Sequence, residues 1–435
     1  MNQFIKNGHL LYFSWTTLII LILLGGWIPR SHGAELSHIQ YELSPEIPPQ
    51  GHTQTCFALS AFYSLQYFRN LLAPLGAPRP KPVSVSQIVT SLWGPRYLDQ
   101  PGWTYAALHN LRKTPLRVGK EPPIEALFDF ERNHSQFLES EMLEGYSRDW
   151  QTLLRDVMPF TELAQISTRV QEALSEIPLE RRSTESLLNR ILPYEQVPPP
   201  TYNVFVFEPT DELFALRRLT NARITQETWV MEEIERLLSP DPHSGISYPL
   251  EFSYCPSPRG EDCDFHSVSV IGIRPHELQV VDGLEYSTPV WVPASPLIQG
   301  FIHFKQAMSY IRPCEATCQP NRILGPFPLH YLVRAGDLES IRSLALNPGS
   351  EEIDRKNRSG FSPVYLAAEG GRVDILNYLI SLGANFTSLQ NGNTPLQIAA
   401  DTQQLAVVEE LLKHWRAHPE TLTPELERRS DHNMT

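Results

Sequence analysis

The sequence predicts a domain that mixes helices and strands, followed by an all-helical array of repeats. Three observations carry this prediction. Apolar residues recur at helical spacing after Cys56, two β-rich runs lie between residues 264 and 283, and a Gly-x-x-Pro motif occurs three times beyond residue 324. With 435 residues, the chain is long enough for two or three domains.

The composition is that of an ordinary globular protein. Hydrophobic residues make up 41% of the chain and charged residues 20%, which excludes wholesale disorder. The net charge of −13 argues against non-specific nucleic-acid binding and against an anionic membrane surface as a partner. We therefore expect no nucleic-acid partner.

The N-terminus has the pattern of an export signal. The stretch from Leu10 to Ile28 is almost entirely apolar, Pro29 breaks any helix, and the small residues from Ser31 to Ala34 offer a cleavage site. We interpret residues 1–33 as a signal peptide and expect the mature protein to be secreted or periplasmic. An apolar stretch of about 19 residues could also span a bilayer, so an uncleaved anchor is the alternative. A membrane partner is expected only in that case.

Four of the five cysteines form two close pairs in the sequence, and the fifth, Cys56, lies far from them. Cys255 and Cys263 flank a short loop, and Cys314 and Cys318 are four residues apart. In an exported chain, close pairs are disulfide candidates, although cross-pairing remains open because the Cys314–Cys318 loop would be very small. The spacings do not favour a zinc site, and we expect neither a metal nor a cofactor. Local pairing leaves Cys56 alone.

Cys56 stands at the start of an amphipathic helix. The apolar residues that recur after it at helical spacing are Phe57, Leu59, Phe62, Leu65 and Phe68. Thr55 or Thr53 could cap this helix, so Cys56 lies in its first turn, where the partial positive charge favours a thiolate. A buried, inert cysteine is the alternative that this local context leaves open.

A predicted hairpin supplies possible partners for the thiol. The run from Asp264 to Ile273 contains His266 near its start, and after a turn the run from Leu278 to Gly283 contains Asp282 near its end. An antiparallel hairpin can bring His266 and Asp282 together at the strand ends. A thiol, an imidazole and a carboxylate form the nucleophile, base and orienting group of acyl-transfer chemistry.

These segments resemble the papain-like cysteine peptidases. The family pattern Gln-Gly-x-Cys-Gly-Ser-Cys-Trp-Ala-Phe-Ser is similar to Gln50-Gly-His-Thr-Gln-Thr-Cys56-Phe-Ala-Leu-Ser60, and the family's histidine strand is similar to the run from His266 to Ile273. The resemblance covers roughly residues 40–115 and 225–312. It implies a two-lobed α+β domain with a helical lobe and a β-barrel-like lobe.

The resemblance also implies roles for individual residues. Cys56 is the nucleophile, His266 its proton partner, Asp282 the group that orients the imidazole, and Gln50 an oxyanion-hole donor. Gly102, in a segment that resembles the helix bordering the family's substrate cleft, is expected to let an extended peptide approach. His52 is expected to face solvent.

The chain departs from the family in several places. Thr53 replaces the first motif cysteine, Phe57 replaces the tryptophan, and Asp282 stands where the family usually has Asn. The segment 116–225 is longer and more polar than the middle segment of the family's peptidase domain. Helices are expected in it at 135–144, 150–158 and 172–192. We interpret this block as an insertion at the cleft or the domain seam, or as an elaboration without a role.

The C-terminal part resembles ankyrin repeats. The motif starts at Gly325, Gly360 and Gly392, and the third copy reads Gly392-Asn-Thr-Pro-Leu-Gln397-Ile-Ala-Ala400. We assign residues 325–417 to about three repeats, residues 313–324 to a linker and residues 418–435 to a flexible tail. The resemblance implies docking of a protein partner, and a stabilising appendage is the alternative.

Together these features predict an exported cysteine peptidase, spanning residues 40–312, that acts on protein or peptide substrates. The alternative is a papain-fold protein that transfers acyl groups, or one that is catalytically inactive and acts as an interaction module.

Overall fold

In the computed structural model of the chain, the described residues are 39, 41–51, 53–94, 98, 100–138, 146–178, 181–241, 245–254, 266–283, 286–314, 318–390 and 392–417. All of them belong to one compact unit that runs from Leu36 to Thr435. The predicted signal peptide, His52, Cys255, Cys263 and the predicted tail lie outside the described residues. Within the described ranges, no helix has the length and apolar character needed to cross a membrane.

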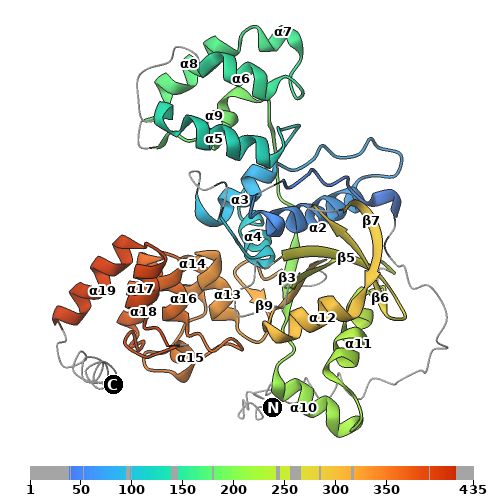
Figure 1. Cartoon of the computed structure of the whole chain (residues 1–435), viewed down its shortest axis with the longest axis vertical. Coiled ribbons are helices and arrows are strands. Elements are labelled where there is room, and N and C mark those ends of the chain that lie inside the picture. The colour runs from blue at the N-terminus through green and yellow to red at the C-terminus, as the bar shows by residue number, and fades with distance from the viewer. Residues whose placement is uncertain are drawn as a thin grey trace, which may run out of the picture. The chain divides into compact units, whose positions relative to one another are not determined.

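The part that contains Cys56 is helical (Figure 1). Its elements are η1 (Tyr41–Leu43), α2 (Cys56–Leu72), α3 (Val85–Trp93) and α4 (Thr104–Leu111). Helix α2 is buried on almost every side because it packs against α3 and α4 on one side and against the sheet on another.

A seven-stranded sheet forms the second layer, in the order β7-β6-β5-β4-β8-β3-β9. Neighbouring strands are antiparallel, except that β9 runs parallel to β3. The strands are β3 (Tyr202–Phe207), β4 (Leu250–Tyr254), β5 (His266–Arg274), β6 (Glu277–Asp282), β7 (Tyr286–Pro293), β8 (Met308–Pro313) and β9 (Ile323–Leu324).

The sheet has a buried core on each face. Val268 and Val270 of β5 pack into a cluster with α11 (Gln226–Leu238) and α12 (Ala294–His303), whereas Ile271 belongs to the cluster that includes α2. Strand β5, which begins at His266, therefore lies between the helix of Cys56 and the α11–α12 pair.

The middle block forms a helical excursion that ends earlier than the sequence predicted. Strands β1 (Leu116–Val118) and β2 (Glu195–Val197) pair as an antiparallel stem, and β3, which follows, already belongs to the seven-stranded sheet. The predicted boundary near residue 225 was wrong for this reason. The exposed helix α10 (Asp211–Thr220) comes after β3 and is separate from the excursion.

Five helices of the excursion are described: α5 (Ile124–Leu138), α6 (Tyr146–Leu154), α7 (Phe160–Leu163), α8 (Ile166–Glu176) and α9 (Thr184–Ile191). The single helix expected over 172–192 was wrong. Pro178 follows the end of α8, and Ser183 starts α9 with a capping box.

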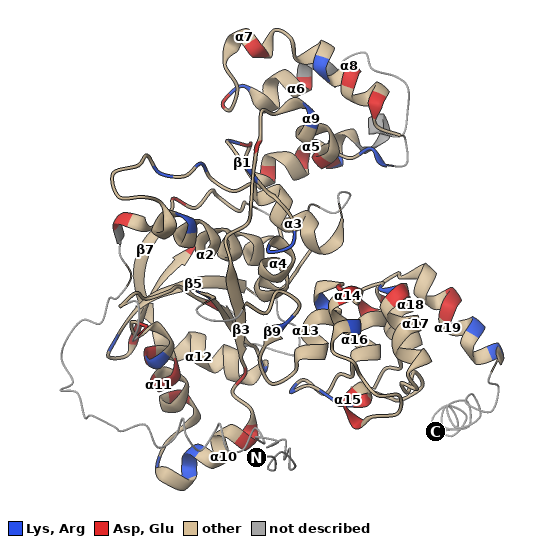
Figure 2. Cartoon of the chain, turned by 180° about the vertical axis from the view of Figure 1, so that it is seen from behind, with Lys and Arg blue, Asp and Glu red and all other residues tan. Residues whose placement is uncertain are grey.

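Acidic residues are spread over several elements of the chain, including α7, α8, α11 and α19 (Figure 2).

The C-terminal helices form three pairs, with one short helix between the first and the second pair. The pairs are α13 (Pro328–Ala335) with α14 (Leu338–Ser343), α16 (Pro363–Glu369) with α17 (Val373–Ser381), and α18 (Pro395–Asp401) with α19 (Leu405–Ala417), and the short helix is α15 (Glu351–Asp354). The Pro of each motif occupies the first helical turn of α13, α16 and α18, and the side chains of Ser362 and Thr394 cap the last two. This explains why the motif recurs at those positions.

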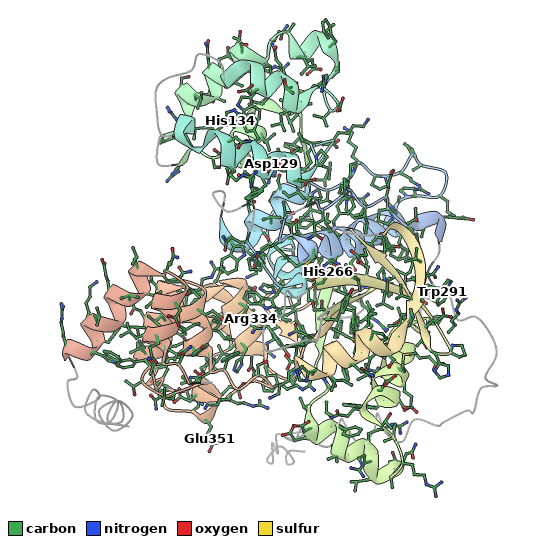
Figure 3. All side chains as sticks on the ribbon, viewed as in Figure 1. Asp129, His134, His266, Trp291, Arg334 and Glu351 are labelled. Carbon is green, nitrogen blue, oxygen red and sulfur yellow. A yellow bond between two sulfur atoms is a disulfide. The ribbon has the colours of Figure 1, made fainter. Side chains whose placement is uncertain are left out.

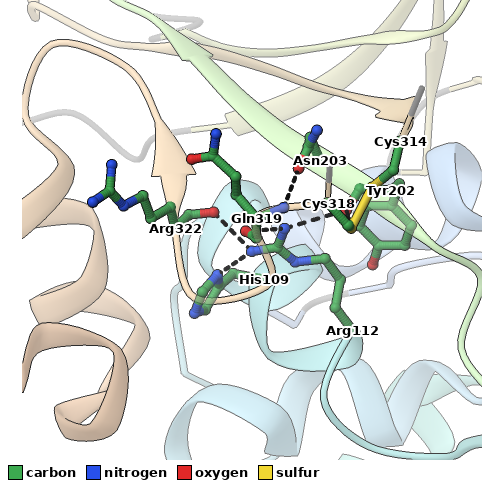
Figure 4. The surroundings of a disulfide bond; sticks show 8 residues. All are labelled: His109, Arg112, Tyr202, Asn203, Cys314, Cys318, Gln319 and Arg322. Atoms are coloured by element: carbon green, nitrogen blue, oxygen red, sulfur yellow. Dashed lines mark hydrogen bonds between the residues drawn. A yellow bond between two sulfur atoms is a disulfide. The ribbon is translucent and has the colours of Figure 1, made fainter. Parts of the chain in front are cut away.

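Helix α4 packs directly on the first repeat. The Asn110 side chain donates to the carbonyl oxygen of Ala335 at 2.9 Å, and His109 Nε2 lies 2.6 Å from Asp337 Oδ2. Arg112 donates to the carbonyl oxygens of Tyr202 and Gln319, next to the Cys314–Cys318 disulfide (Figure 4). The helix that follows Gly102 is thus bonded to both the linker and the repeats.

Candidate active site

Cys56 is the first residue of α2 and is only 9% exposed. Thr55 holds the N-cap position, but its side chain makes no capping hydrogen bond, so the predicted capping by a threonine side chain was wrong. Its hydroxyl lies 2.6 Å from that of Thr53 instead. The sulfur therefore stands at the positive end of a helix of 17 residues.

The loop before Cys56 is held by its own hydrogen bonds. Gln50 Nε2 donates to the Thr53 carbonyl oxygen at 2.6 Å, and the Thr53 hydroxyl donates to the Gln50 carbonyl oxygen at 2.9 Å. Gly51 has φ of 62°, a left-handed conformation that glycine adopts at little cost. Thr53 thus ties the loop at the position where the resembling family has a cysteine.

His266 and Asp282 meet at the ends of two paired strands. The register places Ser269 opposite Val281. His266 is the first residue of β5 and Asp282 is the last residue of β6, so both lie at the same end of this antiparallel pair. His266 Nε2 lies 2.8 Å from Asp282 Oδ1, and both residues are buried. His266 is labelled in Figure 3.

The second ring nitrogen of His266 is available for a hydrogen bond with the sulfur of Cys56. Burial disfavours the charged imidazole, but hydrogen bonds with Asp282 and Cys56, together with the charges of these groups, outweigh burial and raise the pKa of His266 to about 10. Because Nε2 bonds Asp282, Nδ1 is the atom that faces Cys56. This arrangement favours the imidazolium form of His266.

Gln50 is buried near the same strand end. Its backbone N–H donates to the Gly283 carbonyl oxygen at 3.0 Å, and its side-chain Oε1 is buried without a hydrogen-bond partner among the residues that the structure describes. The structure therefore brings together the four residues that the sequence singled out for catalysis: Gln50, Cys56, His266 and Asp282. Their catalytic roles stay predictions.

Gly102 packs against the chain itself. A Cβ atom there would lie 2.7 Å from both Leu92 Cδ1 and Phe57 Cζ. The close approach that requires glycine is thus internal packing, and contact of its backbone with a substrate stays a prediction. Of the disulfide candidates, Cys314 and Cys318 are bonded to each other.

Sequence reasoning missed two residues beside the site. Gly283 follows Asp282, and a Cβ there would lie 2.3 Å from Leu59 Cδ1, so glycine lets α2 approach the end of β6. Glu251 lies in the apolar strand β4 and is 2% exposed. A charged residue between Leu250 and Phe252 was the signal that could have identified it.

In the described part of the chain, no group of three or more His, Cys, Asp and Glu side chains could hold a metal ion.

One solved structure with a local likeness is the complex of the predatory endopeptidase Bd0816 from Bdellovibrio bacteriovorus with the immunity protein Bd3460. The identity is 30%, the match covers 20% of this chain and 44% of that chain, and the TM-score is 0.18. A likeness of this extent carries no argument about the fold or activity of this chain.

The comparison with protein families identifies the C-terminal part. Residues 310–422 match the family of ankyrin repeats in three copies, in agreement with the paired helices from α13 to α19. This region of the chain is an ankyrin-repeat module, a type of domain that serves in protein interaction.

Proposed function

We propose that this chain is an exported cysteine peptidase whose domain over residues 40–312 has a papain-like fold. The observation that carries the proposal is the contact of Cys56 with His266, whose Nε2 in turn bonds Asp282 at 2.8 Å. A helical layer containing the nucleophile and a sheet containing the histidine and carboxylate support the two-lobed assignment.

The chemistry would begin with attack of the Cys56 thiolate on a peptide carbonyl carbon. The carbonyl electron pair moves to oxygen, and this oxyanion accepts hydrogen bonds from Cys56 N–H and from Gln50 Nε2. The Gln50 amide has two N–H donors, one of which bonds Thr53, so the other serves the oxyanion.

Collapse of this intermediate breaks the C–N bond. The leaving amine takes the proton of the His266 imidazolium, which yields a thioester with Cys56 and a neutral imidazole. Water then attacks the thioester and gives its proton to His266, and the thiolate leaves. Asp282 holds the ring orientation throughout and favours the imidazolium.

The ankyrin repeats would hold a protein partner close to the peptidase domain. Support comes from the bonds of α4 to Ala335 and Asp337, which fix the first repeat to the helix that follows Gly102. A protein substrate and a separate docking partner are both compatible with this role.

The test is cleavage of a denatured protein and of a peptide library by the purified mature chain, with Cys56→Ala as the control. The proposal expects fragments that are lost in the variant. Joining of the acyl group to an added amine, without hydrolysis, would instead establish acyl transfer. A chain that does neither, with Cys56 unreactive, would be an inactive interaction protein.

A further inference from the structure

Glu251 is a carboxyl group buried between the helix of the nucleophile and the strand of the histidine. It is the second residue of β4, and its neighbours Leu250 and Phe252 belong to the core beneath α11 and α12. Because side chains alternate along a strand, Glu251 points to the opposite face, toward α2. It is 2% exposed there.

Three serine hydroxyls converge on this carboxyl group. Ser64 bonds Glu251 Oε1, and Ser269 lies 3.3 Å from Oε1 and 3.1 Å from Oε2. Ser60 is also hydrogen-bonded to it. Burial raises the pKa of Glu251 to about 8, against the opposing effect of these serine bonds, so the group is largely protonated at neutral pH.

The serines come from the two elements that carry the proposed catalytic pair. Cys56, Ser60 and Ser64 are spaced by four residues on α2 and therefore lie along one side of the helix. Ser269 lies directly opposite Glu251 in the register of β4 and β5, three residues beyond His266.

A polar group at this place has a cost that an apolar residue would avoid. Its distinctive property is direction, because a hydrogen bond depends on both the distance and the angle between donor and acceptor. A shift of about 1 Å in a catalytic group can cost on the order of a hundredfold in rate.

We infer that Glu251 is a positioning residue for the proposed peptidase reaction. Through Ser60 and Ser64 on α2 and Ser269 on β5, it sets the position of Cys56 relative to His266. This inference rests on the proposed function, since it concerns the same thiol and imidazole.

The test compares variants of two buried carboxyl residues. Glu251→Ala removes the bridge, and Glu251→Gln keeps its shape and its capacity to bond the serines. Glu208→Ala is the matched control, because Glu208 is 8% exposed, has a pKa raised by burial and accepts a 2.8 Å hydrogen bond from Tyr331. Glu208 contacts the first repeat rather than α2. The readouts are the rate of Cys56 alkylation by iodoacetamide at pH 6, kcat, KM and the thermal midpoint.

We expect Glu251→Ala to lower both the alkylation rate and kcat by about tenfold or more with little change in KM, and Glu251→Gln to recover most of the loss. Glu208→Ala should lower the thermal midpoint and leave alkylation and kcat near the wild-type values. If Glu251→Ala does not fold, Ser60→Ala combined with Ser64→Ala serves in its place and should give the same loss.

Wild-type rates in the folded Glu251→Ala protein, or in the double serine variant, would overturn the inference. An equal loss of kcat in Glu208→Ala would also overturn it, because the effect would then be general destabilisation. Failure of the proposed function looks different, because the wild-type chain itself would neither cleave substrate nor react faster than an ordinary cysteine, and the inference would fall with it.

Discussion

The backbone N–H of Gln50 donates to the carbonyl oxygen of Gly283 at 3.0 Å. This bond joins the loop before Cys56 to the residue that follows Asp282, although more than half of the chain separates them in sequence. The strand end that holds the His266–Asp282 pair therefore also supports the proposed oxyanion-hole residue.

Replacing Asp282 tests the orientation of the imidazole. Asp282→Ala removes the acceptor of His266 Nε2 and the negative charge, and we expect kcat to fall about a hundredfold because the ring is no longer held. Since Asp282 contributes to the raised pKa of His266, about 10, the alkaline limb of the kcat profile should move to lower pH. The measurement is kcat from pH 5 to pH 11.

Asp282→Asn is the informative control for that variant. Its side-chain carbonyl still accepts the Nε2 proton, so it should retain more activity than Asp282→Ala while shifting the alkaline limb in the same direction. Equal loss in both variants would show that charge, and not orientation, is the main contribution of Asp282.

Replacing Gln50 tests oxyanion stabilisation. Gln50→Ala should lower kcat by a factor of about 100 to 1,000, corresponding to about 2.7–4 kcal/mol, while the rate of alkylation by iodoacetamide stays close to wild type. Alkylation forms no oxyanion, so comparing its rate with kcat isolates the contribution of Gln50 to oxyanion stabilisation. Thr53→Val serves as a control for the loop, because it removes the Thr53 hydroxyl bonds and leaves the amide in place. A parallel loss of alkylation in Gln50→Ala would contradict the assignment.

The raised pKa of Glu251 predicts a pH-dependent stability. In the unfolded chain this carboxyl releases its proton near pH 4.5, whereas in the folded chain it does so at about pH 8. Between these values the folded state holds the additional proton, so a rise in pH favours unfolding. The free energy of unfolding in urea should decline over this window in the wild type, and the decline should be smaller in Glu251→Gln. An unchanged slope in the variant would contradict this account.

His109, at the junction with the repeats, predicts the opposite slope at lower pH. Burial lowers the pKa of His109 to about 4 despite its bond to Asp337. Between pH 6.5 and about 4 the unfolded chain binds the additional proton, so stability is lost as the pH falls. Denaturation in urea should show a shallower loss for His109→Gln. Asn110→Ala, which removes a junction bond without a titrating group, should lower stability and leave the slope as in the wild type.

Local patterns predicted the elements that contain the candidate site. Helical periodicity placed α2 after Cys56, strand alternation predicted the β5–β6 hairpin with His266 and Asp282, and the Gly-x-x-Pro motif predicted the repeats. Each of these depends on residues that are close in sequence. The catalytic roles assigned to the residues stay predictions.

Two of the relationships that the sequence left open are long-range. The contact of Glu251 with α2 joins residues 187 positions apart, and no local pattern encodes it. The end of the helical excursion depends on the pairing of β3 with β8, which are separated by three helices, α10, α11 and α12, and four strands. The pairing of Cys314 with Cys318 is local, but the sequence could not select it because other pairings of the four cysteines were open.

The central claim is that His266 activates Cys56 as a nucleophile. Its most direct test is mass spectrometry of the mature chain after treatment with an epoxide inhibitor of thiol peptidases, in the wild type and in His266→Ala. We expect a single adduct at Cys56 in the wild type near neutral pH, and a rate at least about tenfold lower in the variant because the imidazole partner of the thiol is gone. An unmodified Cys56 in the folded wild type, or equal rates in the two proteins, would contradict it.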